Sequence, residues 1–302
     1  MAIEHDAAGK SDGFSLVDAL LVGMSFIWGL NFTVIKAALD SFLPLSFNAL
    51  RFSLASLLLI IFLKLKENSL KIRREDLKQF MFLALIGNTI YQILFINGIY
   101  RTTAGNSSLI LATTPIFVAI FSSILGVEKI KRRMWQSILL SFTGIVLIVL
   151  GSGKPISLAA QNLIGDLLIL ACTLCWSAYT VLSKPLLSRY SPLKLVGLTV
   201  AMGTPLLVIV SAPSLLDQKW STVTLEAWLS LAYSACLAVA LGYAIWYTGV
   251  SRIGSAKTAL YEYIITVVAV AASWILLNET MSPIQLFGVA LVFAGLYLSR
   301  KQ

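Results

Sequence analysis

The stretch Trp28-Gly29-Leu30-Asn31-Phe32-Thr33-Val34-Ile35-Lys36 closes the first long apolar segment of the chain, and the chain repeats it. The second copy, 148 positions later, is Trp176-Ser177-Ala178-Tyr179-Thr180-Val181-Leu182-Ser183-Lys184. An aspartate opens each segment, at Asp18 and Asp166, and a proline lies eight residues beyond each lysine, at Pro44 and Pro192. Four residue types at identical relative positions indicate an internal duplication.

The composition is that of a membrane protein. Of the 302 residues, 58% are hydrophobic and 12% are charged, and the mean hydropathy is +0.86. Soluble globular chains are roughly 45–50% apolar and about 25% charged. Because the charges lie in short gaps between long apolar runs, we expect a polytopic protein embedded in a lipid bilayer. We attribute the net charge of +9 to basic residues that attract anionic lipid and set the membrane topology, and we expect no nucleic-acid partner.

The polar tail and the cysteines offer no catalytic chemistry. Residues 1–15 lack the basic n-region, short apolar core and cleavage site of a signal peptide, so we expect the first span to be retained. Cys172, Cys175 and Cys236 all fall in apolar segments, and we interpret them as small packing residues. The single histidine, His5, lies in the tail, so we predict no metal site, no catalytic residue and no cofactor.

Ten stretches are long and apolar enough for membrane-spanning helices, which need about 20 such residues. They are 16–36, 44–64, 78–98, 105–126, 134–152, 163–183, 193–212, 227–249, 256–277 and 283–299. The longest polar gap, residues 64–78, is basic and has room for one interfacial helical turn.

The distribution of lysine and arginine predicts that both termini are cytoplasmic. With the N-terminus inside, 18 basic residues fall in inner loops and tails, and four (Lys36, Arg101, Lys154 and Lys219) fall outside. Positive residues are concentrated on the cytoplasmic side of membrane proteins. We therefore expect a multi-pass protein of the cell (inner or plasma) membrane.

The duplication extends through both halves. At an offset of 151, Gly98 matches Gly249, Arg101 matches Arg252, and the pairs Ser122/Ser273, Glu128/Glu279 and Gly144/Gly295 follow. We therefore divide the chain into the tail 1–15, a first repeat 16–152 and a second repeat 163–299, with five spans in each repeat. Because five is odd, the second repeat must enter the membrane with the opposite orientation, which is the architecture of alternating-access transporters.

Several local motifs resemble the EamA family of the drug/metabolite transporter (DMT) superfamily. They are Trp28-Gly29 to Lys36 in 16–36, Ala49-Leu50-Arg51-Phe52 in 44–64, Thr114-Pro115-Ile116-Phe117 in 105–126, and Gly126 to Ile130 after that span. The resemblance covers residues 16–299. It implies an all-α fold of the ten-helix exporter type, in two inverted five-helix repeats around a central cavity, and export of amino acids or related metabolites. One departure is that the family usually has a Glu-Pro pair where this chain has Ile265-Thr266, with a glutamate one turn earlier at Glu262.

Two ionisable residues lie within the predicted spans. A charged side chain at the centre of a bilayer helix costs on the order of 2.5–3.5 kcal/mol on insertion scales, so Arg51 and Glu262 should face protein or water. Arg51 fits either a helix-end anchor, which snorkels or binds loop carbonyls, or a coupling or gating group. Glu262, flanked by Tyr261 and Tyr263, fits either a protonatable coupling group for a proton or a structural hydrogen bond to a tyrosine or to the backbone. By depth, each lies roughly 10 Å from its own membrane surface, so we do not expect one ion pair.

Two predicted helices carry the candidate substrate pocket. Asn88, Tyr91 and Gln92 have i, i+3, i+4 spacing and should share one face of 78–98, and Tyr243 and Trp246 share a face of 227–249 with Tyr247. Amides on one side and aromatic rings on the other suit a small zwitterion or amphipathic metabolite. Interhelical hydrogen bonds and ordinary aromatic packing explain the same residues.

The repeated motif adds further candidates. Trp28, Asn31, Trp176 and Tyr179 lie deep in their spans, where they would line the cavity. Lys36 and Lys184 fit either headgroup anchors or gates in which the amine pairs with a carboxylate or substrate as one side closes. Pro115 predicts a kink in 105–126. Small residues in 134–152 and 283–299 predict close packing, either between the halves or with a second copy, so a monomer and a homodimer both remain open.

These features favour a secondary transporter that exports amino acids or related small amphipathic metabolites by alternating access. A flippase of lipid or lipid-linked sugar is the alternative, and it would require a lateral opening to the bilayer. A membrane-embedded enzyme is less favoured, because no catalytic acid–base, nucleophile or metal cluster is evident.

Overall fold

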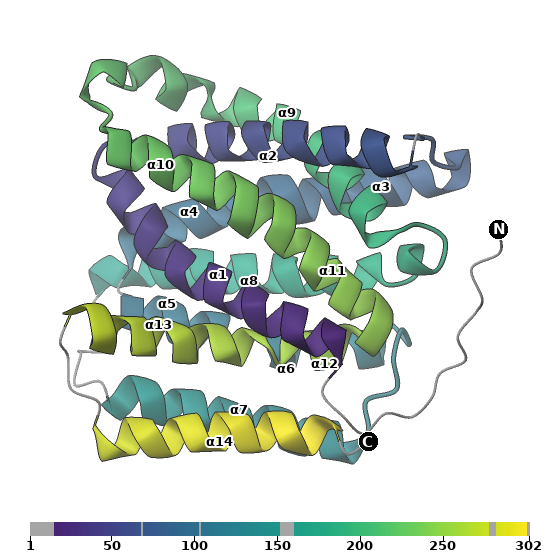
Figure 1. Ribbon diagram of the computed structural model, residues 1–302, viewed down its shortest axis with the longest axis vertical. Helices are drawn as coiled ribbons and strands as arrows, with labels where there is room; N and C mark the ends of the chain where they lie inside the picture. Colours follow the sequence, from purple (N-terminus) through teal and green to yellow (C-terminus); the bar gives the residue numbers. More distant parts are fainter. Residues whose placement is uncertain (1–14, 68, 103, 152–159, 278–281, 301–302) are drawn as a thin grey trace.

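The computed structural model describes residues 15–67, 69–102, 104–151, 160–277 and 282–300, and these residues form a bundle of helices without a β-strand (Figure 1). The α-helices of the first half are α1 (Leu16–Leu39), α2 (Pro44–Glu67), α3 (Leu77–Ala84), α4 (Tyr91–Arg101), α5 (Ala104–Leu111), α6 (Thr114–Ile124) and α7 (Arg132–Gly151). Those of the second half are α8 (Ala160–Ser183), α9 (Pro192–Asp217), α10 (Leu225–Tyr233), α11 (Gly242–Ile253), α12 (Ser255–Ala259), α13 (Glu262–Leu277) and α14 (Pro283–Arg300).

Most predicted spans coincide with continuous helical segments. Within the described residues, eight helical segments are long and apolar enough to cross a membrane. The other two predicted spans, 105–126 and 256–277, are each divided into two shorter helices, α5 and α6 in the first case and α12 and α13 in the second. The all-helical membrane fold is therefore confirmed, whereas the count of ten crossings stays a prediction. The polar gap 64–78 holds one 3₁₀ turn, Arg74–Asp76, as expected.

The first helix begins for a reason visible in the sequence. The Ser15 hydroxyl accepts a hydrogen bond from the Asp18 backbone N–H, and the Asp18 carboxylate accepts one from the Ser15 N–H at 2.8 Å. This reciprocal capping satisfies two of the backbone donors that a helix start leaves without partners. An apolar run then continues to Lys36, whose charge lies at the C-terminal end of the helix dipole.

Two spans change their helical pitch at equivalent places. A π-helical segment, η2 (Leu85–Ile90), separates α3 from α4, and a second, η5 (Ser234–Leu241), separates α10 from α11. Adding 151 to 90 gives 241, so both segments end at the same position of their repeats. Single π-helical turns inside α-helices occur frequently at functional sites.

Two other spans are interrupted. The helix that Pro115 was predicted to kink ends at Leu111 and restarts at Thr114, with the proline in the first turn of α6. The span with Ile265-Thr266 in place of the usual Glu-Pro is also interrupted, between α12 and α13, directly before Glu262. A proline is therefore not required for the second break.

Most large contacts join one half to the other. Helix α7 packs along α14, α2 along α9, and α4 along α8 (Figure 1). A Cβ atom added to Gly144 would lie 2.5 Å from the Gly288 carbonyl oxygen, and one added to Gly288 would lie 2.6 Å from the Gly144 oxygen. The small faces of α7 and α14 therefore pack against each other within one chain.

The two copies of the repeated motif run in opposite directions. Asp18, at the start of α1, forms an ion pair with Arg300, at the end of α14, with 3.0 Å between Oδ1 and Nη2. We call this end of the bundle the terminal end and the opposite one the far end. Lys184, just beyond α8, donates to the Val250 carbonyl near the end of α11, and the adjacent Gly249 lies against Leu21 of α1. Helix α8 thus ends where α1 begins, as inverted repeats require.

Candidate functional site

Seven aromatic side chains from four helical segments meet between the two halves. We call them the aromatic cluster: Trp28, Tyr91, Trp176, Tyr179, Tyr243, Trp246 and Tyr247. The ring centroids of Trp28 and Trp176 are 5.8 Å apart, and that of Trp28 is stacked 5.5 Å from that of Trp246. The two tryptophans of the repeated motif are therefore in direct contact.

Each indole N–H of this cluster has a specific acceptor. Trp28 Nε1 donates to the Ala238 carbonyl in the π-helical segment η5, at 2.8 Å. Trp246 Nε1 donates to the Thr180 hydroxyl at 3.2 Å. Trp176 Nε1 donates to Oε1 of Glu262 at 2.7 Å. The third bond joins a motif tryptophan directly to an ionisable group.

Glu262 lies at the first residue of α13, against the breaks in two spans. Besides Trp176, its hydrogen-bond neighbours include the side chain of Thr114, the first residue of α6. The flanking tyrosines bind elsewhere: the Tyr261 hydroxyl donates to Asp18, and the Tyr263 hydroxyl donates to the Ile138 carbonyl. The carboxylate therefore faces the aromatic cluster and the α5–α6 break.

Asn88, Tyr91 and Gln92, which were expected to share one face, all contact the aromatic cluster. Asn88 Nδ2 donates to the Tyr179 hydroxyl at 3.4 Å, on α8, and Tyr91 packs on Trp176 with 5.2 Å between ring centroids. Gln92 instead faces α2 and α11, and its Nε2 donates to the Tyr243 hydroxyl at 2.9 Å. The π-helical segment η2 includes Asn88 and ends directly before Tyr91.

The Gln92–Tyr243 bond joins equivalent positions of the two repeats. The offset between these residues is 151, the same as for the duplication as a whole, so their contact lies where the repeats meet. The predicted meeting of amide and aromatic side chains is thus present, in the form of a direct hydrogen bond.

Arg51 is buried rather than anchored at a helix end. Its side chain is 3% exposed. Nη2 donates to Oε1 of Gln92 at 2.7 Å, and Nη1 donates to the Ser234 hydroxyl at 3.2 Å. The interpretation of Arg51 as a snorkelling anchor is therefore wrong. Among the described residues Arg51 forms no ion pair, with Glu262 or with any other carboxylate.

Several polar atoms near this centre have no hydrogen-bond partner among the described residues. They are Nε of Arg51 and the side-chain oxygens of Asn31, Asn48 and Asn88. Buried polar atoms are nearly always satisfied, so each such atom requires an explanation. A bound ligand that supplies donors and acceptors is one.

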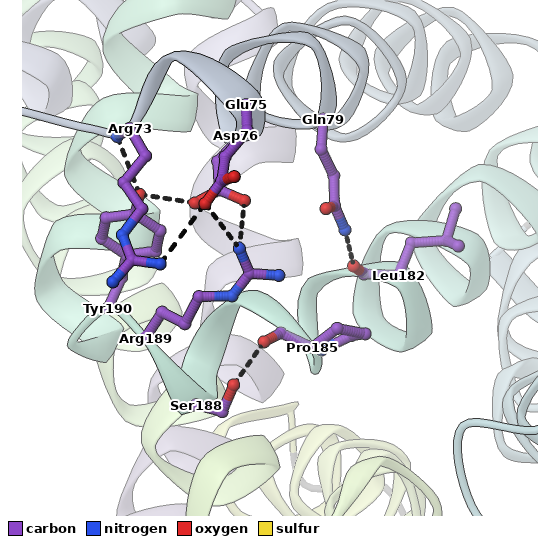
Figure 2. A network of polar contacts seen from close by, with 9 residues as sticks. All are labelled: Arg73, Glu75, Asp76, Gln79, Leu182, Pro185, Ser188, Arg189 and Tyr190. Atoms are coloured by element: carbon purple, nitrogen blue, oxygen red, sulfur yellow. Dashed lines mark hydrogen bonds and ion pairs between the residues drawn. The ribbon is translucent and has the colours of Figure 1, made fainter.

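Four ion pairs between described residues join the halves at the terminal end, one of them between Arg189 and the exposed Glu75 at 3.7 Å. Besides Asp18–Arg300, Arg189 Nη1 lies 2.6 Å from Asp76 Oδ1, and Lys184 Nζ lies 2.7 Å from Glu128 Oε1. Figure 2 shows the buried Asp76 carboxylate between the Arg189 guanidinium and the Tyr190 hydroxyl. Burial, and then the neighbouring Asp76 carboxylate, raise the pKa of Tyr190, so this hydroxyl stays a donor.

The lysines of the repeated motif differ in their surroundings. Lys184 pairs with Glu128, whose carboxylate also accepts from the backbone N–H groups of Ser255 and Ala256 at the start of α12. The Lys184 amine is therefore held by protein contacts. Lys36, at the far end, is exposed. Glu279, which matches Glu128 at the repeat offset of 151, lies outside the described residues.

The far end is joined by neutral hydrogen bonds and by one carboxylate that binds neutral groups. Gln218 Oε1 accepts from the Leu43 N–H at 2.7 Å, and Ser46 and Ser214 share a bond of 2.9 Å. Asp166 accepts from Asn106 Nδ2 at 2.8 Å and also from the Thr102 hydroxyl. Within the described parts of the chain, no ion pair crosses between the halves at this end.

Sequence reasoning missed the polar neighbours of Arg51. Asn48 donates to the Gln92 carbonyl at 2.9 Å, and Ser234 accepts from Arg51. Asn48 stands three residues before Arg51, so helical spacing could have indicated it. Ser234 had no comparable indication. Cys172, Cys175 and Cys236 are free, and the described residues contain no group of three potential metal ligands.

Comparison with known proteins gives a consistent result. The "uncharacterized transporter YyaM" of Bacillus subtilis is 27% identical over 91% of this chain and 90% of its own length. A "probable amino-acid metabolite efflux pump" of Salmonella typhimurium is 29% identical over 96% of this chain and 95% of its own length. A crystal structure with 16% identity superimposes with a TM-score of 0.76, over 95% of this chain and 98% of the other, and so shares the fold.

The model of the EamA-like transporter family matches the chain twice, over residues 15–150 and 163–300. The two matches together span nearly the whole chain, including both copies of the repeated motif and the aromatic cluster between them. The chain therefore belongs to the EamA-like transporter family and is a multi-pass membrane transporter.

Proposed function

We propose that the protein is a secondary active transporter that exports amino acids or related small amphipathic metabolites across the cytoplasmic membrane by alternating access. Both termini would lie in the cytoplasm, and a proton would be the coupling ion. The Salmonella relative is named an amino-acid metabolite efflux pump, which supports the substrate class. The excess of basic residues at loops of the terminal end supports the orientation.

The observation that carries this proposal is the bond between Trp176 and Glu262. It places an ionisable carboxylate against aromatic side chains from both halves, next to interrupted helices. Ionisable groups at membrane depth mark ion pathways and proton relays, and transporter sites lie at repeat interfaces beside discontinuous helices. A Glu262 that gains and loses a proton would alternately break and form this bond, which couples a proton to the substrate site.

The substrate site would use the aromatic cluster together with its amides. Flat aromatic faces hold apolar side chains and cations, while amides orient carboxylate and amine groups. The residues assigned to substrate binding are Trp28, Asn31, Asn88, Tyr91, Gln92, Trp176, Tyr179, Tyr243 and Trp246. Glu262, Lys36 and Lys184 are assigned to coupling or gating, as sequence analysis proposed, and Arg51 is considered separately below.

Alternating access gains support from the difference between the two ends. Four ion pairs between described residues of the two halves close the terminal end, while the described residues at the far end are joined by hydrogen bonds without an ion pair. In this account the structure is closed towards the cytoplasm. Opening that side requires Lys184 to leave Glu128 and Arg189 to leave Asp76.

The test is counterflow in proteoliposomes loaded with an unlabelled amino acid, with a panel of labelled amino acids outside. Saturable uptake that requires the internal amino acid supports the proposal. A Trp176→Ala variant should lose most of this uptake, whereas Trp220→Ala, on the rim at the far end, should retain it. Uptake that does not saturate for any member of the panel would contradict the proposal.

A flippase is the second candidate, because the surface between two adjacent helices is shallowly hollowed. Between α2 and α9 lies a space of about 350 Å³, lined by residues that include Ser53, Ala201 and Pro205. None of its lining residues belongs to the aromatic cluster. Translocation of fluorescent phospholipid in the same proteoliposomes, blocked by Ala201→Trp, would favour the flippase over the exporter.

A further inference from the structure

The protein holds a buried positive charge that no described carboxylate balances. The Arg51 guanidinium contacts Gln92, Ser234 and the faces of two rings, with its Cζ atom 5.7 Å from the centroid of Phe47 and 5.2 Å from that of Phe52. All of these partners are neutral. The Nε atom has no partner among the described residues.

Such an arrangement is unfavourable unless an anion completes it at some stage. A charge taken out of water needs a paired charge or a full set of hydrogen bonds. The guanidinium carries five N–H donors in a planar fork that matches a carboxylate with two parallel bonds. In Arg51 this fork is occupied by one amide oxygen and one hydroxyl.

The contacts of Gln92 allow a substrate to displace its amide oxygen from Arg51. Its Oε1 accepts from Arg51 at 2.7 Å, while its Nε2 donates to the Tyr243 hydroxyl at 2.9 Å. Rotation of the amide would free the Arg51 donors and would leave the glutamine on the same helix. The Asn48 amide lies beside it, 3.4 Å from Oε1, and could donate to a new acceptor.

The position also has the right neighbours for the rest of a substrate. The Tyr243 ring, which Gln92 contacts, lies 5.2 Å from the Trp176 ring and 6.0 Å from the Trp28 ring. A carboxylate held at Arg51 would therefore direct its apolar part into the aromatic cluster. At the other side of Trp176 is Glu262, so substrate and proton sites are joined through one indole.

We propose that Arg51 binds the carboxylate of the transported substrate, and that Oε1 of Gln92 takes the place of that carboxylate when no substrate is bound. The inference rests on the proposed function and narrows its substrate class to organic carboxylates that carry an apolar side chain. It distinguishes these from the corresponding amines and amides, which the aromatic cluster alone would accept equally well.

The test compares leucine and phenylalanine with leucinamide and phenylalaninamide. Binding is measured on purified protein in detergent through the fluorescence of the cluster tryptophans, and transport is measured by counterflow. The amides lack the carboxylate and therefore cannot form its charged hydrogen bonds with Arg51. The wild type should bind each amino acid about 10- to 100-fold more tightly than the corresponding amide. In Arg51→Gln this preference should fall to within about twofold. Arg101→Gln, an exposed arginine at the end of α4, is the matched control and should keep it.

A second variant separates recognition from folding. Gln92→Glu supplies Arg51 with a permanent internal carboxylate, so it should raise the melting temperature and abolish the preference for amino acids over amides. If Arg51 is only a structural link between α2, α4 and η5, Gln92→Glu will leave the preference unchanged, and that result overturns the inference.

The readouts also separate the two proposals. Binding with a carboxylate preference but without counterflow contradicts transport and supports the role of Arg51. Counterflow in which the wild type treats amino acids and amides alike supports transport and overturns the role of Arg51, as does the absence of any carboxylate-dependent binding.

Discussion

The ion pair between Lys184 and Glu128 gives the sharpest prediction about movement. The two side chains are 28% and 17% exposed, and 2.7 Å separates Nζ from Oε1. Exposed pairs contribute about 1 kcal/mol or less, while removal of one partner of a fully buried pair costs about 3–5 kcal/mol. For this half-buried pair we expect a coupling of about 1–2 kcal/mol, which corresponds to a ratio of about 5–30 between closed and open populations.

The perturbation is Lys184→Gln, and the assay is the labelling rate of a cysteine at Ser183. Ser183 is fully buried at the end of α8, so a maleimide can reach it only after the terminal end opens. The native residues Cys172, Cys175 and Cys236 are replaced by alanine. Because labelling follows the open population when opening is fast, Lys184→Gln should accelerate labelling by about 5–30-fold.

A double-mutant cycle completes the test. Glu128→Gln keeps an acceptor for the N–H groups of Ser255 and Ala256 but loses the charge, and the double variant should label no faster than Lys184→Gln alone. Lys36→Gln, at the equivalent position of the other repeat, should leave labelling unchanged. Equal labelling rates in Lys184→Gln and wild type would show that the Lys184–Glu128 pair does not hold the terminal end closed. Strictly additive effects of the two substitutions would show the same.

Three further predictions follow from contacts at single residues. Asp76→Asn should destabilise the protein by about 2 kcal/mol, because Arg189 and Tyr190 lose a buried carboxylate. The control Glu75→Gln, at an exposed residue, should change stability by less than about 0.5 kcal/mol in thermal unfolding, and equal effects of the two substitutions would contradict the account. Gly288→Leu should lower stability by about 1–3 kcal/mol or more, since its Cβ would meet the Gly144 oxygen at 2.6 Å. Gly23→Leu, at a position with open space around it, should be tolerated, and similar melting temperatures of the two variants would show that α7 and α14 can move apart at little cost in stability. Trp176→Phe should keep the ring contacts but remove the indole N–H that donates to Glu262. It should reduce proton-driven transport by about tenfold or more with little change in amino-acid affinity, and an equal fall in affinity would assign Trp176 to packing.

Much of the architecture could be predicted from patterns that repeat along the chain. The two copies of the motif from tryptophan to lysine predicted opposite orientations, and the structure places Lys36 and Lys184 at opposite ends. Small residues in 134–152 and 283–299 predicted close packing, and Gly144 and Gly288 meet. These features depend on periodicity and residue volume, which a sequence displays directly.

The details of the site could not be read in the same way. Helical spacing predicted a shared face for Asn88 and Gln92, but it could not predict the π-helical segment Leu85–Ile90, because no composition marks such a segment. Depth along a helix left Arg51 as either a helix-end anchor or a coupling or gating group, and its partners Gln92 and Ser234 come from segments remote in sequence. The sequence offered a tyrosine or the backbone as a structural partner of Glu262, and the donor at 2.7 Å is Trp176, 86 positions away. Tertiary contacts between the repeats decide each of these points.

The central claim is that Glu262 couples proton movement to transport through the aromatic cluster. The most direct measurement is amino-acid flux in proteoliposomes under an imposed pH gradient, with and without the gradient, for wild type and Glu262→Gln. Our account predicts that the gradient drives concentrative flux in the wild type, and that Glu262→Gln retains counterflow but responds to no gradient. Gradient-driven flux of the same size in Glu262→Gln and wild type would contradict the account.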